Sequence, residues 1–366
     1  MRIPLFRTRL APEAFEAAAQ VLDSGWLGHG ENVVRFEEAF ASYLGVEHCV
    51  AVSSGTAALH LALRILDLPE GAEVVTTPMT WVSSHLAILY ERCRPVMADI
   101  QPLTGNVDPA EIERRISPRT GAIMIVHYCG YPCDLDEVYE VARLHDLPVI
   151  EDCSHAAGAT YRERRIGSAA TLQCFSFGPI KNLTTIQGGA VTSADGRHFG
   201  RLRSLRSLGF ETTVHERLGS RGTTYRSGYR LAEPGFRYEL SDLHAAIGLA
   251  QLPHLDAENA VRAERAGSYA ERLRGVAGLE LLQYAGDRRS SYHMYPVLVE
   301  ERDRLAEKLR GEEIDVGVHY PPNPLIQDSP PPRMERFSAR TLTLPLHPSL
   351  TEDEAESVAA TIAAGW

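Results

Sequence analysis

Short apolar runs alternate with longer amphipathic runs between residues 48 and 195. The apolar runs are rich in β-branched residues and are typical of buried strands, whereas the longer runs have helical spacing. Strands are predicted in HCVAVSS (48–54), EVVTTP (73–78), RPVMADI (94–100), GAIMIVHY (121–128), LPVIEDCSHA (147–156) and TLQCFSF (171–177). This order predicts an α/β fold with a mainly parallel sheet covered by helices. In such sheets ligands bind at the carboxyl ends of the strands.

The pattern changes towards the C-terminus. From Leu240 the chain is strongly helical to about residue 275, and shorter elements follow. They are a strand (SYHMYPVLV, 291–299), a helix (DRLAEKLRG, 303–311), a strand (DVGVHYP, 315–321), a proline-rich loop and a last helix (TEDEAESVAATIAA, 351–364). We therefore expect a large α/β domain over 1–250 and a smaller α+β domain over 251–366.

The segment 197–237 contains nine arginines and little apolar periodicity. A helix over about 198–208 followed by a mobile loop is predicted there. The arginines are compatible with a cationic rim for a diphosphate group. A solvated loop in an arginine-rich chain explains them equally well.

Composition narrows the function classes. The 366 residues are 44% hydrophobic and carry a net charge of -11, which argues against duplex nucleic acid or an anionic membrane as the main partner. The N-terminal residues lack the apolar core of a signal peptide, and no apolar run approaches the roughly 18 residues of a membrane span. Six scattered cysteines, without a metal-binding pattern, suggest reduced buried thiols in the cytoplasm. We expect no metal site.

One lysine stands out chemically. Of the 37 lysines and arginines, Lys181 and Lys308 alone are lysine. Arginine stays protonated, whereas a lysine with a lowered pKa can attack carbonyls and form Schiff bases. Lys308 lies in an amphipathic helix and is interpreted as a solvated charge. Lys181 follows an apolar strand and precedes a Gly-Gly turn, which favours a Schiff-base lysine over a loop lysine retained by chance.

A phosphate site is suggested by SSGTAAL (53–59), where a predicted strand ends and a helix begins. The N–H groups of a helix N-terminus bind anions, and Gly55 allows close approach beside the hydroxyls of Ser54 and Thr56. Serine and threonine are also common helix N-caps, so a purely structural role remains open. Ser176, five residues before Lys181, offers another hydroxyl.

Three further side chains lie at or just after the carboxyl ends of apolar runs, at the same predicted edge. Asp152 is suited to hold the protonated ring nitrogen of a pyridine cofactor, or simply caps a turn. Trp81 is suited to stack on a flat ring, or is a half-buried core aromatic. His155 is suited to contact such a ring, or is a structural histidine.

Taken in order, the motifs SGTAAL, TPMTWVSS, EDCSHAAGA, SFGPIKN and GFRYELSDLHAAIG resemble the DegT/DnrJ/StrS family of sugar aminotransferases. SGWLGHGENVVRFEEAF near the start, and VGVHYP and LPLHPSLTEDE near the end, extend the resemblance over nearly the whole chain. It implies the fold of fold-type I enzymes that use pyridoxal 5′-phosphate (PLP), with a mainly parallel seven-stranded sheet. It also implies a homodimer in which each active site is completed by the partner.

The resemblance further implies the roles of individual residues. Lys181 would form the Schiff base with the cofactor, Asp152 would pair with the pyridine nitrogen, and both would be catalytic. The other cofactor-binding residues would be Trp81 on the ring, His155 against the cofactor, and Ser54, Gly55, Thr56 and Ser176 at the phosphate. Arg237 would reach the partner's phosphate, where the family often has asparagine.

The chain departs from the family pattern at three places. Gln187 stands where a carboxylate is usual, Arg237 and Glu239 occupy the stretch that often holds an asparagine, and His85-Leu86 follow Trp81. The expected reaction is transfer of an amino group from an amino acid, L-glutamate above all, to a keto sugar, most naturally one linked to a nucleotide. A keto-cyclitol or other acceptor, and a non-catalytic binding or regulatory protein, are the alternatives; Lys181 argues against a sugar dehydratase.

Overall fold

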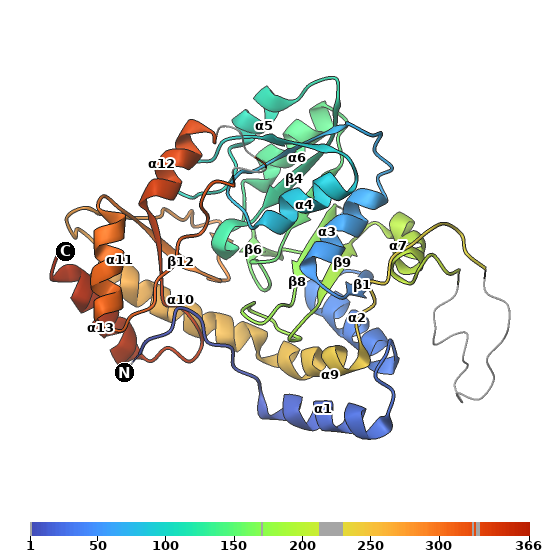
Figure 1. Ribbon diagram of the computed structural model, residues 1–366, viewed down its shortest axis with the longest axis horizontal. Coiled ribbons are helices and arrows are strands. Elements are labelled where there is room, and N and C mark those ends of the chain that lie inside the picture. The colour runs from blue at the N-terminus through green and yellow to red at the C-terminus, as the bar shows by residue number, and fades with distance from the viewer. Residues whose placement is uncertain (1, 170, 212–229, 324–325, 327–329) are drawn as a thin grey trace.

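The computed structural model describes residues 2–366 except 170, 212–229, 324–325 and 327–329. Two β-structured regions lie side by side (Figure 1). The larger surrounds a seven-stranded sheet, and the smaller contains β12 with the orange and red C-terminal helices. No helix in the described part of the chain is long and apolar enough to cross a membrane.

The large sheet has the strand order β1-β9-β8-β5-β4-β2-β3. Its strands are β1 (His48–Val52), β2 (Glu73–Thr76), β3 (Arg94–Met97), β4 (Thr120–Val126), β5 (Val149–Asp152), β8 (Leu172–Ser176) and β9 (Gly189–Ser193). Strands β3, β2, β4, β5 and β8 pair in parallel, and β9 runs antiparallel between β8 and β1. The prediction of a mainly parallel seven-stranded sheet is confirmed.

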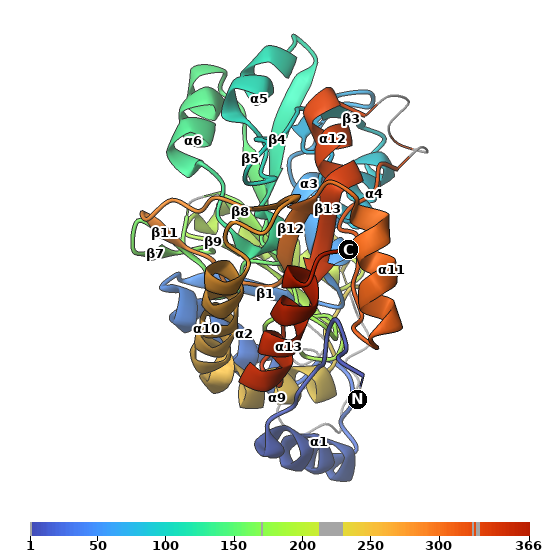
Figure 2. The ribbon, with the colours of Figure 1, turned by 90° about the vertical axis from the view of Figure 1, so that its left-hand side faces the viewer.

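Helices cover both faces of this sheet (Figure 2). Side chains alternate along β4, so that Ile123 and Ile125 enter one apolar core and Ala122 and Met124 the other. The first core contains α2 (Glu31–Leu44), α5 (Pro109–Arg115), α6 (Leu135–Leu144) and α9 (Asp242–Gln251). The second contains α3 (Gly55–Arg64), α4 (Val82–Tyr90) and α7 (Phe199–Arg206). Continuous apolar runs therefore form strands that are buried on both faces.

The C-terminal region has its own core. An antiparallel sheet of β10 (Leu279–Leu281), β12 (Tyr295–Val299) and β13 (Thr341–Leu344) packs with α10 (Leu255–Arg272), α11 (Arg302–Gly311) and α13 (Glu352–Ala363). A further helix, α12 (Pro332–Arg340), packs on β12 through a separate apolar cluster. Ile3 also lies in this core, and α1 (Pro12–Ser24) packs on α9. The domain boundary at residue 250 stays a prediction.

Two local predictions were wrong. Residues 315–321 form no regular strand; Gly317 makes an isolated bridge to Thr343, and the backbone N–H of Tyr320 donates to the sulfur of Met79. The edge position is taken by β13, which was not predicted, and α12 was expected as loop. Tertiary contacts therefore override the local β pattern. The predicted helix over 198–208 corresponds to α7, and the loop predicted after it lies largely outside the described residues.

Smaller elements complete the order of the chain. A short sheet joins β6 (Thr160–Tyr161), β7 (Arg164–Arg165) and β11 (Arg288–Arg289). Single 3₁₀ turns are η1 (Tyr128–Gly130), η2 (Gly196–His198) and η3 (Leu252–His254), the last joining α9 to α10. All six cysteines are buried free thiols, as predicted.

Candidate active site

A cavity of about 320 Å³ lies where β5 and β8 end and where α3 and α4 begin. The sequence-predicted site residues that line it are Ser54, Gly55, Thr56, Trp81, Asp152, His155, Ser176 and Lys181. The structure therefore brings together every predicted site residue except Arg237. This is the carboxyl edge of the parallel strands, where α/β sheets bind ligands.

Asp152 is the last residue of β5 and is almost fully buried. Ser84 of α4 donates a hydrogen bond from Oγ to Oδ2 of Asp152 at 2.8 Å. The backbone N–H of Ser154 donates to Oδ1 at 3.0 Å. The two donors fix the plane of the carboxyl group at the cavity wall.

Lys181 lies in the loop that follows β8 and is partly buried. Burial lowers the pKa of its amine to about 8, and the nearby Asp152 carboxylate opposes that shift. A substantial fraction of the amine is therefore neutral in weakly alkaline solution. This is the form that attacks carbonyl carbons and accepts protons.

The start of α3 forms a cradle beside Ser176. Ser54 is the N-cap of α3, and its Oγ accepts from the N–H of Ala57 at 3.1 Å. A Cβ atom at Gly55 would lie 2.7 Å from Cβ of Ser176, and one at Gly189 would lie 2.4 Å from the carbonyl oxygen of Ser54. Both glycines are therefore needed for this close approach. A helix N-terminus with adjacent hydroxyls suits the phosphate of a cofactor, in addition to the capping role.

Aromatic rings also line the cavity. Trp81 is the N-cap residue of α4 and is 60% exposed, and its ring centroid lies 6.1 Å from that of Tyr320. The exposed indole leaves a face free for a flat ligand. His155 is buried, with Nε2 3.2 Å from the hydroxyl of Tyr320. Its ring stacks on His293 at a centroid distance of 4.6 Å.

The histidines beside Lys181 are neutral. Burial lowers the pKa of His155 and of His293 well below the usual value, and Lys181 adds to both shifts. Burial also lowers the pKa of His319 to about 4. Asn182, the residue after Lys181, has its Oδ1 2.9 Å from Nδ1 of His293. Because the amide oxygen only accepts, the His293 proton is assigned to Nδ1.

Sequence reasoning missed several residues of this cavity. They are Ser83, Ser84, Ser154, His293, His319 and Tyr320. His293 and the pair His319-Tyr320 were assigned to strands because they lie in apolar runs. A histidine inside such a run was the available signal, since buried polar side chains need partners.

The departures from the family pattern lie in different places. Gln187 lines the cavity. His85 does not, because it is buried with Nε2 2.9 Å from the carbonyl oxygen of Thr77. Glu239 accepts a hydrogen bond from Ser207 at 2.9 Å. Arg237 is exposed and lies outside the cavity lining, so its predicted contact is not made within this chain.

Two arginines of the segment 197–237 are not free to form the cationic rim that was considered from the sequence. Arg201 pairs with Asp67 and Glu233. Arg206 is buried and bonds Glu37 and the carbonyl oxygen of Ala51. These two guanidinium groups are therefore committed to the fold.

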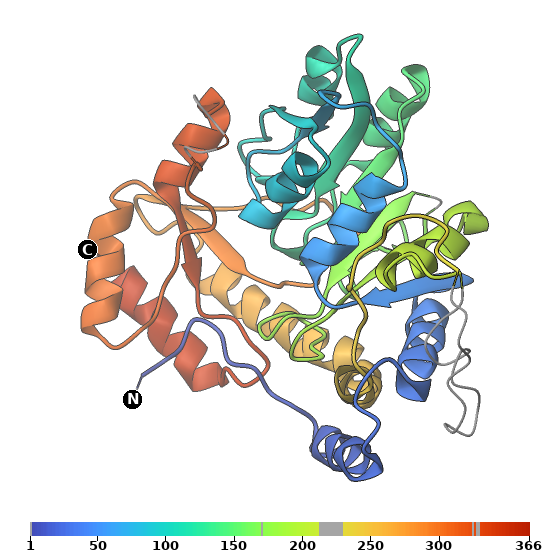
Figure 3. The ribbon, with the colours of Figure 1, turned by 45° about the vertical axis from the view of Figure 1, so that its right-hand side comes forward.

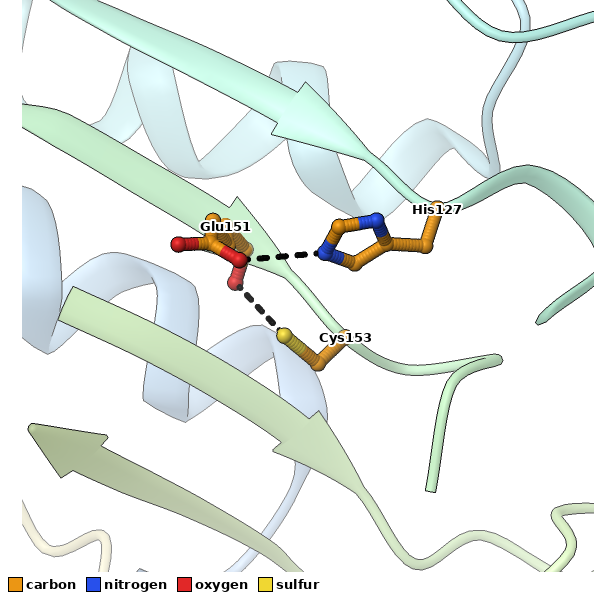
Figure 4. A group of neighbouring side chains, drawn as sticks. All are labelled: His127, Glu151 and Cys153. Atoms are coloured by element: carbon orange, nitrogen blue, oxygen red, sulfur yellow. Dashed lines mark hydrogen bonds and ion pairs between the residues drawn. The ribbon is translucent and has the colours of Figure 1, made fainter. Parts of the chain in front are cut away.

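A buried cluster of His127, Glu151 and Cys153 lies beside Asp152 (Figure 4). The N–H of Cys133 donates to Nδ1 of His127, so the His127 proton is assigned to Nε2, which donates to Glu151 at 3.1 Å. Glu151 also accepts from Tyr139, Thr171 and Gln173. Burial raises the pKa of Glu151, but hydrogen bonds from His127, Thr171 and Tyr139 outweigh it and lower the pKa overall. With its oxygens occupied, this carboxylate braces the end of β5 and is not arranged as a metal ligand.

Comparisons with known proteins identify relatives over the full length. The sequence profile of the DegT/DnrJ/EryC1/StrS aminotransferase family matches residues 8–363. The chain is 36% identical to the spore coat polysaccharide biosynthesis protein SpsC of Bacillus subtilis, over 97% of this chain and 95% of that protein. It resembles the crystal structure of AtS13 from Actinomadura melliaura at 38% identity, with a TM-score of 0.93 over 100% and 99% of the two chains. The sugar aminotransferase CalS13 from Micromonospora echinospora matches at 34% identity, with a TM-score of 0.92 over 100% of both chains.

The cradle, the carboxylate and the lysine are what a PLP enzyme requires, and the whole chain matches one family of such enzymes. A non-catalytic role is therefore not retained. The protein belongs to the DegT/DnrJ/EryC1/StrS aminotransferase family and is a PLP-dependent aminotransferase.

Proposed function

We propose that this aminotransferase moves an amino group from L-glutamate to the keto group of a nucleotide-linked sugar. The observation that carries the proposal is the convergence of Lys181, Asp152 and the α3 N-terminus on one cavity. Relatives named as a sugar aminotransferase and as a polysaccharide biosynthesis protein favour a sugar acceptor.

The lining residues fit the cofactor group by group. Gly55, Thr56 and Ser176 would bind the phosphate together with the N–H groups of α3, with Ser54 capping the helix. Asp152, oriented by Ser84, would hold the proton on the pyridine nitrogen. Trp81 would cover one face of the ring, and His155 would contact it. When bound, PLP supplies an electron sink for the carbon that carries the amino group.

Lys181 has two roles in the proposal. Its Nζ would hold the cofactor between turnovers and, when free, would take the proton from Cα of the donor. A pKa of about 8 suits both roles, because the amine is easily interconverted between its two protonation states. The neighbouring imidazoles of His155 and His293 have strongly lowered pKa values and are uncharged, so they do not act as cations beside Lys181.

The assembly is part of the proposal. We infer a cytoplasmic homodimer in which Arg237 reaches the partner's cofactor phosphate. The exposure of Arg237 outside its own cavity supports this arrangement. Mixing an Arg237→Ala chain with a Lys181→Ala chain tests it. In a mixed dimer, one site then receives both altered residues. The other site receives an unchanged Lys181 from one chain and an unchanged Arg237 from its partner, so it should be active.

Acceptor choice is tested with three compounds of equal concentration. They are a nucleotide-linked keto sugar, the same sugar without its nucleotide, and a keto-cyclitol, each supplied with L-glutamate. The proposal expects amino transfer to the first, detected as 2-oxoglutarate release and as amine product by mass spectrometry. Transfer to the keto-cyclitol alone would replace the sugar proposal with its alternative.

A further inference from the structure

A second, narrower pocket adjoins the active-site cavity. It has a volume of about 20 Å³ and shares Ile180, Lys181 and His293 with the large cavity. Residues 6–9 of the N-terminal segment line it, and this segment runs from the C-terminal helices towards α1 (Figure 3). The charged side chains in its lining, apart from Lys181, are Arg7, Arg9, Glu258 and Arg262.

Arg262 is the unusual member of this pocket. It lies in α10 and is only 6% exposed. Its side chain makes a long hydrogen bond, 3.4 Å from Nη1 to Oδ1 of Asn259. Within the described residues, no carboxylate lies close enough for an ion pair with it. Burial lowers the pKa of Arg262 to about 10, and Glu258 opposes this shift without cancelling it.

Two other little-exposed arginines of the described residues have a carboxylate partner. Arg206 has the Glu37 carboxylate and the carbonyl oxygen of Ala51. Arg265, on the same helix as Arg262, donates to the carbonyl oxygen of Leu350 and pairs with Glu264. A buried guanidinium without a carboxylate is unfavourable unless a ligand supplies the negative charge. The Arg262 site is therefore incomplete in the chain alone.

The charge balance of the pocket favours an anion. Arg7, Arg9 and Arg262 outnumber the single carboxylate of Glu258. Burial also raises the pKa of Glu258, although Arg262, Arg9 and His254 oppose that shift. The volume suffices for about one water-sized group, which matches an oxygen of a carboxylate or phosphate.

The large cavity lacks such a cation. Among the residues described, its lining contains Lys181 and Asp152 as the charged groups, apart from its histidines. Lys181 is occupied with the reacting centre. The narrower pocket, which shares Ile180 and His293 with this cavity, offers guanidinium groups to a carboxylate or phosphate of a substrate held there.

We propose that Arg262, with Arg7 and Arg9, forms a subsite for one carboxylate or phosphate group of a substrate bound beside Lys181. The existence of the anion site rests on the pocket itself. Its assignment to a substrate rests on the proposed function.

Anion binding is measured first, on the PLP-loaded protein, so that the phosphate cradle is already filled. The Tm is followed as inorganic phosphate or glutarate is added at constant ionic strength. A ligand that binds the folded state raises the Tm with its concentration. We expect a saturable rise for the unchanged protein and for Arg272→Met, an exposed change on the same helix. We expect the apparent Kd for the anion to rise at least 10-fold in Arg262→Met.

Two variants distinguish loss of the anion site from loss of the fold. Arg262→Met removes an unpaired buried charge, so its Tm without anion should equal or exceed that of the unchanged protein. Arg7→Gln changes an exposed residue of the N-terminal segment and should weaken anion binding without loss of fold. Unchanged anion affinity in both variants would overturn the inference.

The source of the anion is settled by measuring the two half-reactions separately. A rise in KM for L-glutamate alone in Arg262→Met assigns the subsite to the donor carboxylate. A rise for the nucleotide-linked acceptor alone assigns it to a phosphate. Unchanged KM for both, in a protein whose anion binding is lost, overturns the assignment to a substrate. Failure of amino transfer to every acceptor, with anion binding to Arg262 intact, would instead refute the proposed function.

Discussion

Ser84 and Asp152, which are 68 residues apart in the chain, are joined by a 2.8 Å hydrogen bond at the wall of the active-site cavity. Ser84 Oγ also lies 2.8 Å from Oγ1 of Thr80, so a short hydroxyl chain leads to the carboxylate. The first turn of α4 therefore sets the direction of a side chain on β5.

Replacing Ser84 by alanine should slow the donor half-reaction. Hydrogen bonds to charged groups contribute about 1.5–3 kcal/mol, so the rate constant should fall roughly 10- to 100-fold. Single-turnover kinetics with L-glutamate measure it. Ser83→Ala is the matched control, because Ser83 bonds Thr56 instead and should change cofactor affinity more than rate. A Ser84→Ala rate constant equal to that of the unchanged protein would show that Ser84 does not orient Asp152 for the reaction.

Replacing Gly55 by alanine should weaken PLP binding. The added methyl group would lie 2.7 Å from Cβ of Ser176, so the cradle has to open. Equilibrium dialysis against PLP should show an affinity at least 10-fold lower. Gly267→Ala in α10 is the control, since nothing lies within 4 Å of its added methyl group. That change should leave cofactor affinity unaltered and stabilise the helix by about 0.5–1 kcal/mol.

Lys181 should titrate near pH 8 in the cofactor-free protein, because burial disfavours its charged form. The chain has two lysines, so reductive methylation with ¹³C-formaldehyde gives two lysine NMR signals, with Lys308 as the internal reference. The Lys181 signal is identified by its loss in Lys181→Ala. Replacing Asp152 by asparagine should lower this pKa further, because the carboxylate raises it. A midpoint near the ordinary lysine value of about 10.4 would contradict the described burial.

Glu151 should link stability to pH. Its pKa in the folded state lies below the unfolded value of about 4.3, so its contribution is present above that pH and is lost as the pH falls below it. Glu151→Gln should lower the unfolding free energy at pH 7 by roughly 2–5 kcal/mol and flatten its decrease in acid. Urea denaturation at pH 7 and pH 4 measures both effects.

Glu140→Gln serves as the control for that experiment. Glu140 is a carboxylate of α6 that pairs with Arg143 at the surface, so its change should lower the unfolding free energy much less than Glu151→Gln does. Equal losses in the two variants would show that the Glu151 network adds nothing beyond a surface ion pair.

The sheet and most of the site were predictable because their signals are local. Each apolar run before residue 177 forms a strand, and Ser54, Asp152, Ser176 and Lys181 follow or end such runs. Residues after parallel strands meet at one edge, so sequence position sufficed to group them.

The rest depended on contacts between distant segments. His293 and Tyr320 reach the cavity from a region expected to form ordinary strands, and their partners Asn182 and His155 are more than 100 residues away. No local periodicity encodes such pairs. The incomplete ion pairing of Arg262 is likewise visible only once α10 meets the N-terminal segment.

The visible absorption spectrum of the purified protein, before and after addition of L-glutamate and beside Lys181→Ala, tests the central claim most directly. We expect a yellow protein whose Lys181–cofactor absorption disappears on addition of glutamate as 2-oxoglutarate is released. Lys181→Ala should lack that linkage. Absorption that glutamate leaves unchanged would contradict glutamate as the donor. A protein that takes up no PLP when it is supplied would contradict the role assigned to Lys181 and its cavity.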